Sequence, residues 1–354
     1  MLDNYSNKKI LITGNTGFKG PWLCLFLKTL GASVIGYSDK IPWKNGIFNK
    51  HSIGKYVKQY WGNITDYKKL SRVIDKEKPD LIFHLASQPI VLESYKNPLK
   101  TLNININGSI NLLDIVNQNC SNTPIVIITS DKVYKNDNKY NLFYENTELS
   151  GSCPYSTSKV CVEMIAKSYY EISENMTIST ARAGNVIGGG DWSENRIIPD
   201  LIRSIKKDKI FLIRNPKSVR PWTHVLDITL GYLLIGLNLF KCKSGFETFN
   251  LGADHTKDVT VLDLSKILMN KFNIKTLKIL ENKNAFNEKA AIRLNSFKIK
   301  KKLNWKPHFN YHDAIKQTAE WYEKSLKNEN SIKITLDQIK NYLEILNIKN
   351  RNYA

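Results

Sequence analysis

The sequence predicts an α/β protein built on a doubly wound parallel sheet, because strand-like and helix-like patterns alternate through its first half. Runs rich in Val, Ile and Leu are typical of strands buried on both faces. They occupy residues 9–14, 33–38, 80–86, 124–130 and 177–184. Amphipathic stretches typical of helices lie between them, near 18–30, 66–77, 99–119 and 155–174. This order predicts one sheet with helices on both faces.

The alternation breaks after about residue 184, where shorter elements and loops bearing Gly and Pro follow. We expect residues 1–184 to form a nucleotide-binding domain, with some later segments returning to it. Residues 185–354 are expected to form mainly a smaller substrate-binding lobe. The last segment, 331–354, has the apolar spacing of a helical extension. No low-complexity linker separates the lobes, so we expect one folded body with a cleft between them.

Composition and charge narrow the class of protein. The 354 residues include 42% hydrophobic side chains and carry a net charge of +20, with the lysines dispersed along the chain. The most basic segment, 296–307, is interpreted as a solvated lysine face, so we expect no nucleic-acid partner. The longest apolar run, 228–240, is too short to span a bilayer and is typical of a buried helix, so we expect no membrane partner.

The cysteines point to a reducing compartment. They are scattered, odd in number and without a CxxC pair, which favours free thiols in the cytoplasm over a disulfide framework or a metal site. No apolar signal segment precedes the first strand. The cysteines are Cys24, Cys120, Cys153, Cys161 and Cys242.

A glycine-rich turn joins the first strand to an apolar helix. Glycines three residues apart at this point let the backbone approach a pyrophosphate, and the amino terminus of the helix favours an anion. The spacing is GxxGxxG, for which an ordinary tight turn is the alternative. Its place in the first strand-to-helix turn favours dinucleotide binding. The residues expected to hold the dinucleotide are Gly14, Thr16, Gly17, Phe18 and Gly20.

An acidic residue after the second strand is expected to hold the adenosine ribose if the dinucleotide is NAD. Asp39, which lies 19 residues after Gly20, is the candidate. Lys40 follows it and could instead favour the 2′-phosphate of NADP. NAD is therefore the preferred cofactor, and NADP is the alternative. Asn63 is the candidate for the adenine edge, although an asparagine in a turn needs no ligand to explain it.

Tyr155 and Lys159 lie four residues apart at the start of a predicted helix, so they share one helix face. There the Lys159 ammonium can lower the pKa of the Tyr155 phenol and reach a cofactor ribose. Upstream, Ser130 ends a predicted strand and is followed by Asp131 and Lys132. A YxxxK pair arises easily by chance, but its combination with the glycine-rich turn and the serine at a strand end is specific.

At this point the chain resembles the extended short-chain dehydrogenase/reductase family over nearly its whole length. The segments "TGNTGFKG", "HLASQP", "YSTSK", "ARAGNVIGGGD" and "RPWTHVLD" occur in the order typical of that family. Three details look most like its CDP-glucose 4,6-dehydratase branch: "GNTGFKGPWL", "TSDK" and "GGGDWSENRIIPD". The resemblance implies a Rossmann fold, bound NAD and conversion of CDP-glucose to CDP-4-keto-6-deoxyglucose. It also implies a homodimer, paired through the helices near 99–119 and 155–174.

The mechanism that the resemblance implies uses the residues after the fourth strand. Tyr155 would take the proton of the C4 hydroxyl, with Ser130 sharing that hydrogen bond, while NAD accepts the C4 hydride and later returns it to C6. A base would remove the C5 proton, and Asp131 would protonate the departing C6 hydroxyl. Most relatives have a glutamate as that base, whereas this chain has Lys132, which can act only when neutral. A simple ion pair between Lys132 and Asp131 is the alternative, and it would suit a reductase or an epimerase.

The resemblance also suggests which residues contact the sugar nucleotide. Arginine forks suit phosphate oxygens, and two arginines lie in the matching motifs. His84 is expected to pack at a strand end, and Asn105 to be architectural. The residues expected to bind substrate are Gln88, Asn185, Asp191, Trp192, Arg196 and Arg220.

Two other functions stay open on the sequence. A sugar-nucleotide 4-epimerase would use Tyr155 and NAD without needing Asp131 and Lys132. A non-catalytic nucleotide-binding protein would need none of these side chains, so the joint presence of Ser130, Tyr155 and Lys159 speaks against it. No pattern that we can interpret specifies the base of the nucleotide.

Overall fold

The computed structural model describes residues 2–49, 51–137, 142–173, 175–206, 210–213, 215–242, 244–253, 259–274, 276–279 and 292–351. Its centre is a seven-stranded sheet in the order β11-β7-β5-β4-β1-β2-β3, and every pairing between neighbouring strands is parallel. The predicted fold class is thereby confirmed. The strands are β1 (Lys9–Thr13), β2 (Ser33–Ser38), β3 (Lys58–Trp61), β4 (Leu81–His84), β5 (Ile125–Ile128), β7 (Thr177–Ala183) and β11 (Gly245–Leu251).

All five predicted strands are present, and two further strands occupy the edges of the sheet. The sequence of β3, KQYW, is largely polar and only partly buried, so it lacks the apolar run that marks the central strands. β11 comes from the second half of the chain and pairs with β7 over its full length. The order runs outward in both directions from β1 and β4, which places the topological switch point between these two strands.

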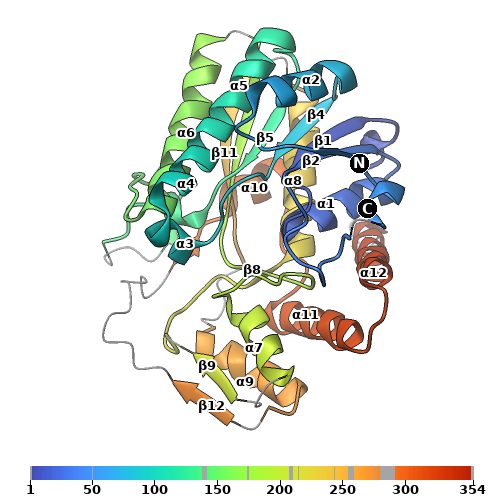
Figure 1. Ribbon diagram of the computed structural model, residues 1–354, viewed down its shortest axis with the longest axis vertical. Coiled ribbons are helices and arrows are strands. Elements are labelled where there is room, and N and C mark those ends of the chain that lie inside the picture. The colour runs from blue at the N-terminus through green and yellow to red at the C-terminus, as the bar shows by residue number, and fades with distance from the viewer. Residues whose placement is uncertain are drawn as a thin grey trace.

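Helices cover both faces of the sheet, as the alternation of side chains along β1 requires (Figure 1). Ile10 and Ile12 belong to the core beneath α1 (Lys19–Thr29) and α8 (Val225–Leu239). Leu11, between them, belongs to the core on the opposite face. The helices on that face are α2 (Tyr67–Glu77), α5 (Gly108–Asn119) and α6 (Pro154–Ile172).

The expected buried helix at 228–240 is part of α8, whose residues are nearly all buried. The amphipathic stretch near 99–119 is a continuous helical path. It begins with α4 (Pro98–Leu102), passes through a π-helical segment at Asn103–Asn107 and ends with α5. The short helix α3 (Val91–Lys96) precedes it.

A smaller group of elements lies beyond the carboxyl ends of the strands, in the lower part of Figure 1. Strands β9 and β12 pair in parallel there, next to α7 and α9. Two further short parallel pairs, β8 with β10 and β6 with β13, complete the connections. The bounds are β6 (Leu142–Phe143), β8 (Val186–Ile187), α7 (Ile197–Lys206), β9 (Ile210–Ile213), β10 (Thr223–His224), α9 (Val261–Lys271), β12 (Thr276–Ile279) and β13 (Arg293–Leu294).

The chain ends in three helices, α10 (Phe297–Leu303), α11 (Tyr311–Leu326) and α12 (Ser331–Arg351). The predicted helical extension is therefore present as α12, and residues 352–354 lie outside the described residues. Tyr342 of α12 packs edge to face on Phe26 of α1 at 6.3 Å and donates a 2.6 Å hydrogen bond to buried Asp227. This helix thus anchors the chain end against the nucleotide-binding half.

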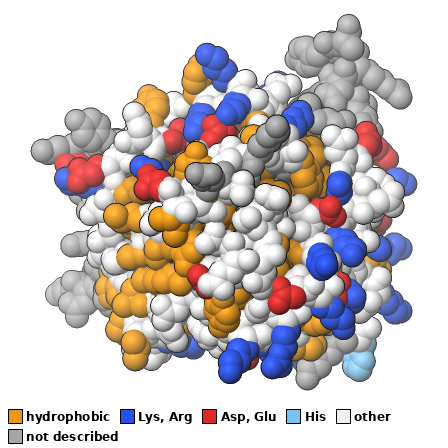
Figure 2. Space-filling view, turned by 90° about the horizontal axis from the view of Figure 1, so that it is seen from above, with side chains coloured by type: hydrophobic (Ala, Val, Ile, Leu, Met, Phe, Trp, Pro, Cys, Tyr) orange, Lys and Arg blue, Asp and Glu red, His pale blue; other side chains and the backbone are white. Residues whose placement is uncertain are grey.

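On the face seen in Figure 2, hydrophobic side chains gather on the left half, and the charged side chains lie mainly toward the margins, with Lys and Arg most frequent at the right and lower edge. Among the described residues, no helix combines the length and the apolar character needed to cross a membrane. The same residues contain no group of three or more His, Cys, Asp and Glu side chains placed to hold a metal ion.

Candidate active site

A cavity of about 1420 Å³ opens at the carboxyl ends of the central strands, between the sheet and the smaller group of elements. This is where doubly wound α/β proteins bind ligands. The structure brings to its wall every residue predicted for the site except Trp192. The predicted residues in the wall are Gly14, Thr16, Gly17, Phe18, Gly20, Asp39, Asn63, Gln88, Ser130, Asp131, Lys132, Tyr155, Lys159, Asn185, Asp191, Arg196 and Arg220.

The glycine-rich turn is shaped by close backbone contacts. Gly14 has a φ of +71°, and a Cβ there would lie 2.6 Å from the Ala86 nitrogen. A Cβ on Gly20 would lie 2.5 Å from the carbonyl carbon of Asn15. Gly17 differs, because a Cβ there would meet only the Gly14 oxygen at 3.5 Å. Gly14 and Gly20 are thus required by the fold, whereas Gly17 leaves free space on the cavity side.

The same turn fits a dinucleotide. Helix α1 begins at Lys19 without a side-chain cap, and its first residues line the cavity next to Gly17. The unpaired N–H groups of a helix amino terminus are suited to a pyrophosphate. Asp39 follows β2 in the cavity wall, where the carboxylate of an NAD site is expected. Asn63 accepts a hydrogen bond from the Thr65 N–H at 3.1 Å, so its Oδ1 also shapes the turn that carries it.

We predict that Gly17→Ala lowers the affinity for NAD by about tenfold or more, because the added methyl group occupies the space where a phosphate approaches the backbone. Calorimetric titration with NAD measures the change. The melting temperature is expected to stay within about 2 °C of wild type, since no backbone contact is violated. Gly54→Ala, where a Cβ meets nothing within 4 Å, is the matched control. Unchanged NAD affinity in Gly17→Ala would contradict this placement.

Tyr155 and Lys159 lie one turn apart on α6 and are both buried. Cys153 and Ser156 form a capping box that starts this helix where β5 ends in the sheet. The Lys159 ammonium donates to the Ile128 carbonyl at 3.2 Å, and burial lowers the pKa of Lys159 to about 8. Burial raises the pKa of Tyr155, and a hydrogen bond with Ser130 offsets part of that rise. The net pKa of Tyr155 is therefore raised instead of lowered, because desolvation is the largest influence on it.

Asp131 carries the least satisfied polar atom of the site. Its Oδ1 accepts a 2.9 Å hydrogen bond from Ser130, whereas its Oδ2 is buried and has no hydrogen-bond partner in the described structure. An orphaned buried carboxylate oxygen costs stability, so its retention indicates a partner that binds in the cavity. The Cα of Gly184 faces this oxygen, and a Cβ there would come within 3.4 Å of it.

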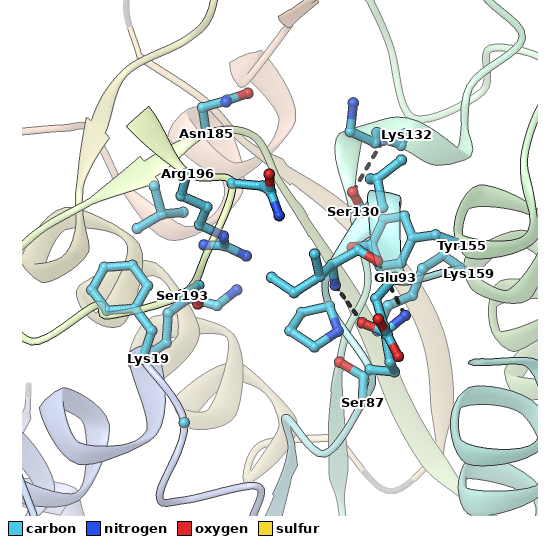
Figure 3. Close-up of a pocket in the computed structure, with 18 of the residues that line it drawn as sticks. Lys19, Ser87, Glu93, Ser130, Lys132, Tyr155, Lys159, Asn185, Ser193 and Arg196 are labelled. Carbon is cyan, nitrogen blue, oxygen red and sulfur yellow. Dashed lines mark hydrogen bonds between the residues drawn. The ribbon is translucent and has the colours of Figure 1, made fainter. Parts of the chain in front are cut away.

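Figure 3 shows that the polar side chains of the cavity lie on two opposite walls. Ser130, Lys132, Tyr155 and Lys159 lie on one side, supplied by the end of β5 and by α6. Asn185, Ser193 and Arg196 lie on the other, together with Lys19 from α1. Lys132 is half-buried, and its backbone N–H donates to the Ser130 hydroxyl at 3.2 Å.

Arg196 and Arg220 both line the cavity. The carboxylate of buried Asp191 accepts from the Arg196 guanidinium at 3.2 Å and from the Ser193 N–H at 3.0 Å. Asp191 thus orients Arg196 instead of facing an anionic ligand itself. Arg220 is buried in the wall and donates to the Val219 carbonyl at 2.9 Å.

Two predicted substrate contacts are revised by the structure. Trp192 is absent from the cavity wall, because its ring packs edge to face on Tyr322 at a centroid distance of 5.4 Å. Gln88 lines the cavity, but its amide donates to Thr101 and to the Ile90 carbonyl and accepts from the Ile90 N–H. We therefore assign Gln88 to the shape of the loop and withdraw Trp192 from the site.

His84 and Asn105 are architectural, as expected. The ring of His84 bridges the hydroxyls of Thr13 at 2.7 Å and Ser109 at 3.0 Å. Burial, assisted by the nearby charge of Lys159, lowers the pKa of His84 to about 3. Asn105 donates to Ser158 on α6 at 2.8 Å and accepts from the Gln88 N–H at 2.7 Å.

Lys19 is a site residue that the sequence analysis missed. It is the first residue of α1, lines the cavity and donates to the Tyr232 hydroxyl at 2.9 Å. Burial lowers the pKa of Lys19 to about 7, and the charges of Lys159 and Arg196 act in the same direction. A cation in the first turn opposes the helix dipole, so this local conflict was the signal available in the sequence.

We predict that Lys19→Met removes a rise in stability between pH 7 and pH 8. The pKa of Lys19, about 7, lies below the 10.5 of a free lysine, so the unfolded chain binds more protons above pH 7 and stability increases with pH. The lowered pKa of Lys159 also makes the stability rise with pH, but only from about pH 8 upward. Urea unfolding of wild type should show a gain of about 1 kcal/mol across this interval. Exposed Lys28→Met is the control, and a Lys19→Met variant that keeps the rise would contradict the assignment.

Comparison with known proteins places the chain in a family. Residues 11–318 match the family model described as GDP-mannose 4,6 dehydratase. The chain is 32% identical to the CDP-glucose 4,6-dehydratase of Salmonella typhimurium over 97% of this chain and 99% of that protein.

Solved structures agree with the fold. The UDP-glucose 4-epimerase of Thermotoga maritima, solved with UDP-glucose, superposes with a TM-score of 0.80 at 22% identity, covering 90% of this chain and 99% of that chain. The dTDP-glucose 4,6-dehydratase of Bacillus anthracis, solved with NAD, gives a TM-score of 0.77 at 22% identity, covering 90% and 98%. The chain therefore belongs to the GDP-mannose 4,6-dehydratase family of extended short-chain dehydrogenases/reductases.

Proposed function

We propose that the chain is a NAD-dependent sugar-nucleotide 4,6-dehydratase that converts CDP-glucose to CDP-4-keto-6-deoxyglucose. The observation that carries the proposal is the buried Oδ2 of Asp131, which has no hydrogen-bond partner among the described residues although Asp131 lines the same cavity as Tyr155 and Lys159. A dehydratase needs an acid there, whereas a 4-epimerase does not. The similarity to a CDP-glucose 4,6-dehydratase over 97% of the chain supports the choice of substrate.

NAD, when bound, would supply the hydride acceptor and donor for the sugar. The residues that would hold it are those of the glycine-rich turn, with Asp39 at the adenosine ribose. Tyr155 is assigned to the proton of the C4 hydroxyl, and Ser130 shares that hydrogen bond from the end of β5. Lys159 lies one turn from Tyr155 on α6, where its ammonium would favour the phenolate and oppose the rise in the Tyr155 pKa that burial causes.

The elimination of water falls to the residues after Ser130. A ketone at C4 makes the neighbouring C5 proton acidic, and we assign the half-buried Lys132 as the base that removes it. Asp131 delivers a proton to the departing C6 hydroxyl through its free Oδ2. Ser130 keeps the other oxygen of that carboxylate fixed, so the acid is held in one orientation.

The opposite wall is assigned to the nucleotide. Arg196 and Arg220 would hold the diphosphate, since guanidinium groups bind phosphate oxygens through two parallel hydrogen bonds. Asn185, labelled beside Arg196 in Figure 3, would contact the same region. Asp191 keeps Arg196 in place for this contact.

Two properties of the whole protein belong to the proposal. The α5 and α6 face is proposed as a homodimer interface, because α6 exposes Met164 and Ile172 at 64% and 70% of their surface. The proposed compartment is the cytoplasm, where the five cysteines, all free in the structure, would remain reduced. Light scattering of the purified protein tests the dimer.

Mass spectrometry of sugar nucleotides tests the reaction. The protein is incubated with NAD and, separately, with CDP-, dTDP-, GDP- and UDP-hexoses. Loss of one water from CDP-glucose alone is the expected result. A product of unchanged mass but altered C4 configuration would establish an epimerase instead, and no change in any substrate would leave a nucleotide-binding protein without this chemistry.

A further inference from the structure

A buried carboxylate lies directly beneath the catalytic side chains of α6. Glu163 is 3% exposed and accepts hydrogen bonds from Thr129, from Thr180 at 2.7 Å and from two nitrogens of Arg182, each at 2.9 Å. The two arginine bonds form a bidentate pair between α6 and β7. Both partners are nearly inaccessible to solvent, so this is a fully buried ion pair.

The arginine extends this contact beyond the pair. Arg182 donates a second set of hydrogen bonds, to the Tyr134 hydroxyl at 2.9 Å and to the Glu145 carbonyl at 3.0 Å. Its guanidinium also lies over the Tyr134 ring at 5.0 Å. The Tyr134 hydroxyl in turn donates to Asn250 of β11 at 2.6 Å. The network therefore joins α6, β7 and β11.

The residues that this network contacts lie on both sides of the segment after β5 that carries Ser130, Asp131 and Lys132. Thr129 immediately precedes Ser130, and Tyr134 follows Lys132 by two residues. On the other side, Glu163 lies one turn after Lys159 and two turns after Tyr155 on the same face of α6. One ion pair thus connects the helix that carries Tyr155 and Lys159 to both ends of the segment that carries Ser130, Asp131 and Lys132.

Stability alone does not explain why such a pair is present. Desolvation of two buried charges costs about as much as their attraction returns, and apolar replacements of equal volume are often as stable. A buried ion pair is, however, directional, and it fixes one relative placement of the elements that it joins. The site also needs this charge, because Glu163 raises the pKa of Lys159 against the lowering by burial.

We propose that Glu163 and Arg182 are positioning residues for the dehydratase reaction: they fix α6 against the Ser130–Lys132 segment and balance the charge beside Lys159. This inference rests on the proposed function. The titratable groups that act electrostatically on Lys159 or respond to its charge are Glu163 on its own helix, Lys19 on α1 and His84 on β4. Tyr155 lies one turn away on α6, Asp131 acts on Tyr155 and on Lys19, and Arg182 on β7 is paired with Glu163.

We expect substitutions of the two residues to shift the pH dependence of kcat in opposite directions. In Glu163→Gln, the carboxylate that raises the pKa of Lys159 is lost, so this pKa falls. The high-pH limb of kcat, meaning the loss of kcat at high pH that we assign to deprotonation of Lys159, then begins at lower pH. In Arg182→Gln, the Glu163 carboxylate is left uncompensated, so the same limb moves to higher pH. We expect shifts of about one pH unit in each direction. A role in folding alone cannot produce shifts of opposite sign.

A second measurement does not depend on turnover. Hydrogen exchange followed by mass spectrometry is expected to show amides of residues 129–134 exchanging about tenfold faster in both variants than in wild type. Glu148→Gln is the matched control: it removes the same charge from an exposed ion pair with Lys135, and neither the pH limb nor the exchange should change. If a variant does not fold, Thr129→Val removes one donor to Glu163, and its kcat should fall about tenfold with KM unchanged.

The outcomes separate the two proposals. A wild type that dehydrates no sugar nucleotide defeats the proposed function, while the exchange of residues 129–134 still decides whether the pair positions this segment. Shifts of the pH limb in the same direction for Glu163→Gln and Arg182→Gln would overturn the charge-balancing role. Unchanged exchange of residues 129–134 in both folded variants would overturn the positioning role.

Discussion

Tyr155→Phe is expected to lower kcat by about 10²–10⁴-fold, the usual contribution of a positioned acid–base group. The substitution removes only the hydroxyl that takes the C4 proton and leaves the buried ring in place. Substrate affinity should stay within about threefold of wild type, because no assigned contact with the nucleotide is lost. Steady-state kinetics with CDP-glucose and a binding titration together measure the two quantities.

Tyr169→Phe supplies the control for this substitution. Tyr169 lies on the same helix, but its hydroxyl contacts Asp114 on α5, away from the cavity. Its kcat is expected to equal that of wild type. A Tyr155→Phe variant with more than about a tenth of wild-type turnover would remove Tyr155 from the chemistry and leave the site as a nucleotide-binding pocket.

Asp131→Asn is expected to stop the loss of water while sparing the first oxidation. The amide keeps an oxygen that accepts from Ser130, but its N–H group is far too weak an acid to protonate the departing C6 hydroxyl. Formation of the 4-keto-6-deoxy product should fall by more than about 10²-fold. Absorbance at 340 nm should rise on addition of CDP-glucose, because oxidation at C4 proceeds without completion of the cycle.

Asp114→Asn, at a half-buried position of α5 outside the cavity wall, is the control for the loss of one carboxylate. It should leave product formation unchanged. Equal loss of the absorbance change and of the product in Asp131→Asn would show that Asp131 acts before elimination, which contradicts its assignment as the acid. Wild-type rates in that variant would require another proton donor in the cavity.

The parts of the fold and site that depend on short segments could be predicted from the sequence. Buried parallel strands are continuous apolar runs, so β1 and β5 were evident, and the turn after β1 required glycine at positions where a side chain would clash. The pairing of Tyr155 with Lys159 follows from helix geometry alone. These features need no knowledge of contacts that are distant along the chain.

The features that could not be predicted from the sequence, or were predicted wrongly, depend on contacts between residues that are distant along the chain. Glu163 and Arg182 are far apart in the chain from the residues that they hold, so no local pattern reveals the network. Trp192 lies between two residues that line the cavity, but its own ring packs on Tyr322 of α11, which is far away in the sequence. The polar edge strand β3 is set by pairing with β2, which its own sequence does not predict.

The central claim is that one cavity oxidises C4, removes water across C5 and C6 and reduces C6 of a single bound sugar. CDP-glucose carrying deuterium at C4 tests it most directly, because the label reports where the hydrogen of C4 is delivered. Nuclear magnetic resonance of the product should show deuterium in the C6 methyl group after a single passage through the enzyme. Deuterium that is retained at C4, or lost to water, would contradict the account.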